Sequence, residues 1–106
     1  MKEDKNTTQL DAEGMHFVLV ICRYDRGLQD FIIVYFVEEG GKRKEIVRYD
    51  CAHGFAHRDL PSLSEKDKRR KKRMPDLPLK QQFIMARDDV LSNWKKYWME
   101  SEGRAK

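Results

Sequence analysis

The chain has 106 residues, of which 40% are hydrophobic, 38% charged and 10% aromatic. This length suits one domain with a modest core, and it is too short for a two-domain enzyme, a large barrel or a dinucleotide-binding fold. Because the charged fraction is well above the usual quarter, the apolar residues must be concentrated in a few elements.

Neither a membrane span nor a disulfide framework is expected. The longest apolar segment, residues 31–37, is far shorter than the ~18–20 residues that cross a bilayer. Residues 1–14 are polar and lack the apolar stretch of a secretory signal. Cys22 and Cys51 are the two cysteines, too few for a disulfide framework, so we expect free thiols. These features predict a cytoplasmic protein.

The N-terminal half of the sequence indicates strands. Residues 1–14 show no periodicity and are expected to form a flexible arm. Residues 15–23 and 30–38 are rich in β-branched and aromatic side chains, which predicts two strands joined by a turn at Asp25-Arg26-Gly27. The second is apolar at every interior position, which indicates a central strand covered on both faces. A second copy of the chain in a homodimer, an inhibitor protein, or the loop, third strand or arm could cover its second face.

A third strand and a helix complete the expected fold. Glu39-Gly40-Gly41-Lys42 predicts a tight turn, and residues 43–50 predict a more exposed strand. From Leu79 to Met99 apolar residues recur at threes and fours, which predicts a helix. We therefore expect an α+β fold in one domain over residues 15–106, with an antiparallel meander of at least three strands packed by a long C-terminal helix. The apolar helix residues are Phe83, Ile84, Val90, Leu91, Trp94, Tyr97 and Trp98.

The positive charge is concentrated in one segment. Residues 65–73 hold seven basic and two acidic residues, whereas the rest of the chain holds fifteen and sixteen. Adjacent like charges repel, so we expect an exposed, mobile basic loop over residues 62–78. RNA or another polyphosphate is the favoured partner, because neutralising phosphates releases condensed counterions; an acidic protein partner and plain solvation are the alternatives. The basic block comprises Lys68, Arg69, Arg70, Lys71, Lys72 and Arg73.

The densest chemical signal precedes this block. His53 and His57 lie four residues apart, and a histidine pair can act as general base and acid near neutrality. RNA cleavage by the 2′-hydroxyl needs both a general base and a general acid, since one group removes the 2′ proton while another protonates the leaving 5′-oxygen. Arg48 or Arg58 could stabilise charge on the phosphorane, and Asp59 could orient an imidazole.

Nearby residues support other interpretations. Tyr49, on the half-exposed third strand, could stack on a base, and Asp50 could replace Asp59 in orienting a histidine. His53, His57 and Asp59 could instead bind a divalent metal, although we expect no metal or other cofactor. Cys51 beside His53 is a weak candidate thiol nucleophile. In a purely structural interpretation, His53 caps the end of the third strand while His57, Arg58 and Asp59 form a hydrogen-bonded turn, and His16 is structural as well.

The segment Val47–Asp59, VRYDCAHGFAHRD, resembles a group of small bacterial and archaeal proteins of unknown function. It is also similar to the TumE-like toxins of toxin–antitoxin pairs. The resemblance covers Phe31 to Asp59, and its specific part is the pattern Tyr49-Asp50-x-x-His53-Gly54-x-x-His57-x-Asp59. It implies a small nucleic-acid-directed toxin encoded beside a DNA-binding antitoxin, with His53, His57 and Asp59 as the functional positions.

The first hypothesis is therefore a toxin-like, metal-independent endoribonuclease. Its catalytic residues would be His53, His57, Arg58, Asp59 and Arg48, while Tyr49 and the basic block would hold the RNA. One alternative is a non-catalytic nucleic-acid-binding module that uses the same block. The other is a protein-interaction module that docks an acidic partner.

Overall fold

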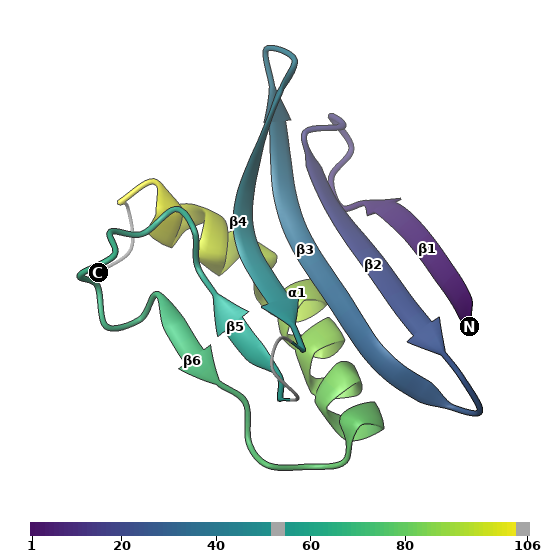
Figure 1. Cartoon of the computed structure of the whole chain (residues 1–106). Helices are drawn as coiled ribbons and strands as arrows, with labels where there is room; N and C mark the ends of the chain where they lie inside the picture. Colours follow the sequence, from purple (N-terminus) through teal and green to yellow (C-terminus); the bar gives the residue numbers. More distant parts are fainter. Residues whose placement is uncertain (52–54, 104–106) are drawn as a thin grey trace.

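In the residues that the structure describes, 1–51 and 55–103, the computed structural model has six antiparallel strands and one helix. The elements are β1 (Lys2–Gln9), β2 (His16–Tyr24), β3 (Leu28–Glu39), β4 (Lys42–Asp50), β5 (His57–Asp59), β6 (Lys71–Arg73) and α1 (Leu79–Ser101). The strands pair in chain order, so the sheet is a meander from β1 to β6 (Figure 1). The predicted α+β fold, an antiparallel meander with a long C-terminal helix, is confirmed.

The predicted tight turns are present, and glycine explains them. Gly40 and Gly41 join β3 to β4 with φ angles of 56° and 78°. Two successive positive φ values are what a two-residue hairpin turn of type I′ requires, and glycine reaches them without steric penalty. The turn between β2 and β3 likewise places Gly27 at a φ of 120°.

The N-terminal segment is a strand and not the expected flexible arm. β1 pairs with β2 along its whole length, from Lys2 opposite Tyr24 to Gln9 opposite Phe17. All eight of its side chains are exposed. Backbone hydrogen bonds hold this strand to the sheet, and no apolar alternation reveals it in the sequence. The expectation for residues 1–14 is therefore corrected to an edge strand over Lys2–Gln9.

The core lies between the sheet and α1, which covers one face of the sheet and lies behind it in Figure 1. Alternate residues of β3 face this layer, where the ring of Tyr35 lies 5.9 Å from that of Trp94. His16 is buried here as well, with Nδ1 2.6 Å from the Tyr35 hydroxyl. No helix in the described part of the chain is long and apolar enough to cross a membrane. The fully buried β3 residues of this layer are Phe31, Ile33, Tyr35 and Val37.

The helix uses a narrower face than its sequence suggests. Ala86 and Val90 are completely buried, whereas Ile84 and Leu91 are exposed although they share the apolar periodicity. A helix on a sheet buries one stripe only, and the stripe that contains Ala86 permits the closest approach.

The second face of the central strand is covered within the chain. Phe36 is 1% exposed because its ring stacks on Phe17 with centroids 5.5 Å apart, and the Arg43 guanidinium lies 3.9 Å from its centroid. Val34 on the same face is also buried. Of the options that the sequence left open, the third strand contributes through Arg43, whereas Phe17 comes from the first strand, which was not among them.

Candidate nucleic-acid interface

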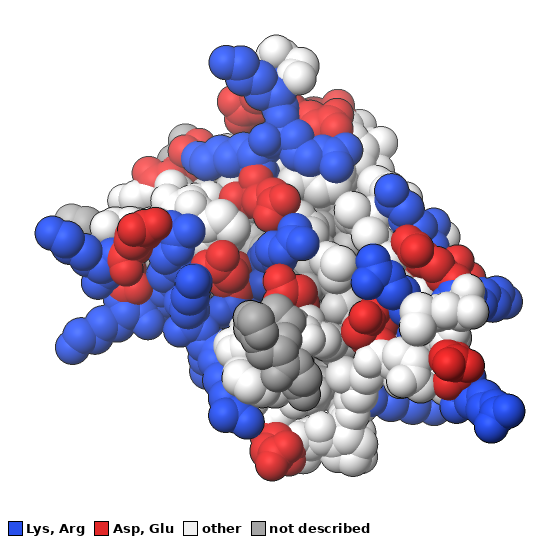
Figure 2. All heavy atoms as spheres, viewed as in Figure 1, with Lys and Arg blue, Asp and Glu red and all other residues white. Residues whose placement is uncertain are grey.

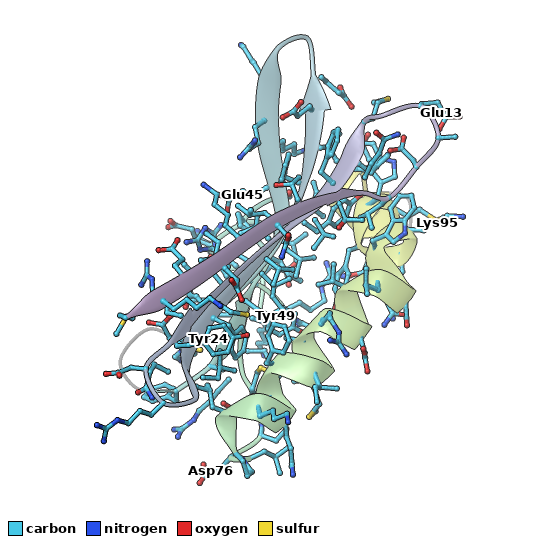
Figure 3. The ribbon with its side chains drawn as sticks, turned by 90° about the vertical axis from the view of Figure 1, so that its right-hand side faces the viewer. Glu13, Tyr24, Glu45, Tyr49, Asp76 and Lys95 are labelled. Atoms are coloured by element: carbon cyan, nitrogen blue, oxygen red, sulfur yellow. The ribbon has the colours of Figure 1, made fainter. Side chains whose placement is uncertain are left out.

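The register of β4 and β5 divides the predicted site residues between the two faces of the sheet. Side chains alternate along a strand, and Tyr49 and Arg58 reach residues of α1. The residues directly before and after them in β4 and β5 therefore lie on the face away from the helix. In Figure 3 Tyr49 lies between the sheet and α1, whereas Glu45 lies on the opposite side. The cross-strand pairs are Arg48 with Asp59, Tyr49 with Arg58, and Asp50 with His57.

On the face away from α1, ion pairs engage the predicted catalytic arginine and aspartate. Arg48 Nε lies 3.2 Å from Asp50 Oδ2, and Arg48 Nη1 lies 3.5 Å from Glu45 Oε1. Asp59 Oδ1 makes no hydrogen bond within the described residues, but Arg70 Nε lies 3.6 Å from it. Two carboxylates already neutralise much of the charge on Arg48. The structure thus brings Arg48, Asp59 and His57 to one face, inside an ion-pair network.

The predicted histidine pair is described only in part. His53 lies outside the described residues, so the acid/base pair and the His53/His57/Asp59 metal set have no geometry to report. The ring of His57 lies 4.5 Å from that of Phe55, and the Arg73 guanidinium lies 4.2 Å from the Phe55 centroid. Among residues 1–51 and 55–103, no three side chains form a group suited to a metal ion.

On the helix side, Arg58 and Tyr49 belong to a polar cluster that joins the sheet to α1. The hydroxyls of Tyr49 and Tyr97 donate to the same oxygen, Asp89 Oδ2, at 2.7 and 2.5 Å, and Asn93 donates to Oδ1 at 2.8 Å. Arg58 Nη1 donates to the Tyr97 hydroxyl at 3.3 Å. Burial, followed by the hydrogen bond to Asp89, raises the pKa of Tyr97 to about 12 and raises that of Tyr49 as well.

This Asp89 cluster corrects two expectations. Tyr49 is only 6% exposed and its hydroxyl is bound to Asp89, so it is not the half-exposed stacking residue that was expected. Arg58 faces α1, so it does not share a centre with His57 and Asp59. Asp89 was not among the residues that the sequence analysis proposed for the site. The one feature of the sequence that indicates it is its position next to Val90, which lies on the buried stripe of the helix.

Part of the basic block is a strand, whereas the sequence predicted a loop throughout. Its last three residues form β6, the terminal strand of the described sheet. Arg69 lies 2.8 Å from Asp67 and 3.6 Å from Glu100, and its hydrogen bonds hold the pKa of Asp67 at about 2. Arg70 donates to the Leu63 carbonyl at 2.7 Å. These two arginines therefore attach the block to the domain.

The other four cations of the block are exposed, and in the described part of the chain no carboxylate lies within ion-pair distance of them. Figure 2 shows Lys and Arg side chains gathered along the side of the molecule where β5 and β6 lie. We call these residues, Lys68, Lys71, Lys72 and Arg73, the cationic edge.

A cavity of about 500 Å³ opens between this edge and α1. Lys72 contributes positive charge, and the Asp89 cluster contributes Tyr49, Arg58 and Asp89. Apart from Arg73, whose guanidinium packs on Phe55, the remaining wall is apolar. Its lining residues are Tyr49, Arg58, Lys72, Arg73, Met74, Pro75, Met85 and Asp89. The cavity follows from the alternation along β5 and β6, which turns Arg58 and Lys72 to the helix side.

These features define a small α+β protein with an antiparallel meander, one covering helix and a cationic edge strand. Over residues 1–104 the sequence matches the domain of unknown function DUF7718, and the chain belongs to that family. No curated protein and no solved structure shows a detectable similarity to it.

Proposed function

We propose that this protein binds RNA through the cationic edge, without catalysis. The observation that supports this most directly is the set of four exposed cations that lack a carboxylate partner in the described chain. An unpaired cation keeps its full attraction for a phosphate, whereas Arg48 and Arg69 are already neutralised within the domain.

The geometry of the cationic edge suits contact with the phosphate backbone of RNA. By register, Lys71 and Arg73 lie on the face of Asp59 and His57, whereas Lys72 lies on the side of Arg58. A phosphate chain passing over the strand edge therefore meets positive charge from both faces of the sheet. Such contacts position a nucleic acid without reading its bases, so the edge by itself supplies affinity with little sequence preference.

The test is fluorescence anisotropy with a short labelled single-stranded RNA, titrated between about 50 and 200 mM salt. The variant K68Q/K71Q/K72Q/R73Q is compared with K2Q/K5Q/K42Q/K44Q, whose four lysines are also exposed but lie on β1 and at the start of β4. Each variant loses four charges, which takes the formal net charge from +4 to zero.

We expect the edge variant to lose RNA affinity and the control to keep it. Each phosphate contact adds about 0.7 to the slope of log affinity against log salt for a single strand, so losing four contacts lowers the slope by about 3. Equal losses in both variants would mean that net charge alone attracts RNA. If polyglutamate bound the protein as tightly as RNA does, the result would indicate an acidic protein partner instead.

A second candidate function is RNA cleavage by a toxin-like enzyme, with a cognate antitoxin as partner. It is favoured by the placement of Arg48, His57 and Asp59 on one face of neighbouring strands, beside Lys71 and Arg73. Either function is proposed for the cytoplasm, since both cysteines are free thiols.

The cleavage test incubates RNA with wild-type and His57→Ala protein, in EDTA and with added divalent metals. Cleavage in EDTA that His57→Ala abolishes, with RNA affinity retained, supports the enzyme. Equal cleavage by both proteins indicates a contaminating nuclease and contradicts it. Cleavage that requires metal would favour the ligand set that includes His57 and Asp59.

A further inference from the structure

We infer that the cavity between the cationic edge and α1 binds one nucleotide unit, with the phosphate at Arg58 and Lys72 and the base against Met74, Pro75 and Met85. This inference rests on the proposed RNA binding and deepens it, because it turns a backbone contact into recognition of an unstacked nucleotide. Proteins that recognise single-stranded RNA commonly hold such splayed bases in pockets.

The charges that line the cavity favour a single phosphate. Three cations and one carboxylate are among its described lining residues. The carboxylate, Asp89, already accepts hydrogen bonds from Tyr49, Tyr97 and Asn93, so its charge is stabilised inside the protein. The cavity therefore keeps an excess of positive charge at its mouth, where the exposed Lys72 lies on the helix side of β6 and has no carboxylate partner in the described chain.

Arg58 extends this positive wall inward. Its Nη1 and Nη2 atoms donate to the Tyr97 hydroxyl and to the Arg69 carbonyl, both at 3.3 Å, and both acceptors are uncharged. Its Nε atom is buried and has no hydrogen-bond partner in the described part of the chain. A guanidinium held by neutral oxygens keeps its charge available to an anion, and an unsatisfied buried donor is normally costly.

The remaining wall suits a flat apolar ring. Met85 is 43% exposed, which is high for an apolar side chain beside a cavity, and Met74, which is buried in the core, lines the same cavity. Thioether side chains are flexible and polarisable, so they adapt to an aromatic ring. A volume of about 500 Å³ falls within the range of about 300–1,000 Å³ that is usual for small-ligand sites.

The five methionines provide the probe and its control. Methyl NMR of methionine-labelled protein follows Met74 and Met85 in the cavity, while Met99 borders a different cavity near Trp98. The titrants are adenosine monophosphate, adenosine and inorganic phosphate. We expect the monophosphate to shift Met74 and Met85 but not Met99, at a concentration at least tenfold lower than either fragment needs.

Two charge-matched variants complete the test. Met85→Glu places a carboxylate at the cavity wall, and Met99→Glu places one on the same helix at a similarly exposed position. Met85→Glu should weaken monophosphate binding at least tenfold, and Met99→Glu should leave it unchanged. A shift of Met99, equal shifts with phosphate alone, or equal effects of both variants would overturn the inference. RNA binding that depends on the cationic edge would survive any of these results, so the two proposals fail separately.

Discussion

Asp89 accepts hydrogen bonds from tyrosines of two elements, Tyr49 of β4 and Tyr97 of α1. Through these contacts one carboxylate connects the sheet to the helix at the rim of the cavity. Both hydroxyls belong to residues that are at least nine-tenths buried, so each needs an acceptor from the protein. The same side chain therefore supports the fold and shapes the wall of the proposed nucleotide site.

Removing this acceptor should destabilise the protein. Asp89→Ala leaves two tyrosine hydroxyls without their partner, and we expect the free energy of unfolding to fall by about 2–3 kcal/mol. Asp88→Ala, one residue away and exposed, should change it by less than about 0.5 kcal/mol. Urea unfolding followed by circular dichroism measures both. Equal effects would show that the Asp89 hydrogen bonds contribute nothing specific.

The tyrosines also predict a stability loss at high pH. The pKa of Tyr97 is raised to about 12 in the fold, against about 10 in the unfolded chain. A raised folded-state pKa means that the native state holds its proton longer, so this contribution is complete below pH ~10 and is lost as the pH rises towards 12. Unfolding free energies measured across this window should fall less steeply for Tyr97→Phe than for the wild type. Identical slopes would contradict the pKa shift.

At the scale of elements, the two edges of the sheet differ sharply from its centre. All side chains of β1 and β6 are exposed, whereas β3 is buried from Ile33 to Val37. An edge strand also pairs on one side only, so opening it breaks fewer hydrogen bonds and exposes little apolar surface. The edges are therefore held by backbone pairing, and the centre by packing as well.

Hydrogen exchange should reveal this difference. Amides in residues 2–9 should exchange through local opening and become labelled much earlier than those in residues 31–37, which should require global unfolding. Exchange followed by mass spectrometry of peptides from these segments provides the measurement. Equal protection of both segments would mean that β1 is as firmly held as the central strand.

At the scale of the whole molecule, one helix on one sheet face encloses the core, so stability depends on the narrow stripe where the two layers touch. Ala86 and Val90 belong to that stripe, and both are completely buried. Leu91 follows Val90 directly but is 46% exposed.

Because of this arrangement, we expect Val90 to contribute more to stability than Leu91, although its side chain is smaller. Val90→Ala should lower the unfolding free energy by about 2 kcal/mol, because it leaves a cavity between the layers. Leu91→Ala removes more atoms but should cost less than about 0.5 kcal/mol, since they already contact water. Thermal unfolding of both variants tests the expectation, and a larger loss for Leu91→Ala would mean that the helix face is assigned incorrectly.

Local patterns in the sequence were sufficient for β2, β3, β4, α1 and the two tight turns, because apolar periodicity and paired glycines act within a few residues. The basic block was equally visible, since it is a matter of composition. β1, β5 and β6 were not visible, because hydrogen bonds to neighbouring strands hold them, their side chains are polar, and β5 and β6 have only three residues each.

The candidate site needed the tertiary structure. Strand register separated Arg58 from His57 and Asp59 although the three are adjacent in sequence, since successive side chains point to opposite faces. Docking of α1 brought Asp89 to Tyr49, forty residues away along the chain, and so created the polar wall of the cavity. The sequence by itself determined which segments are apolar and where the charge is concentrated. Only the packing of the helix on the sheet decided which of those charges are neutralised and which face an open cavity.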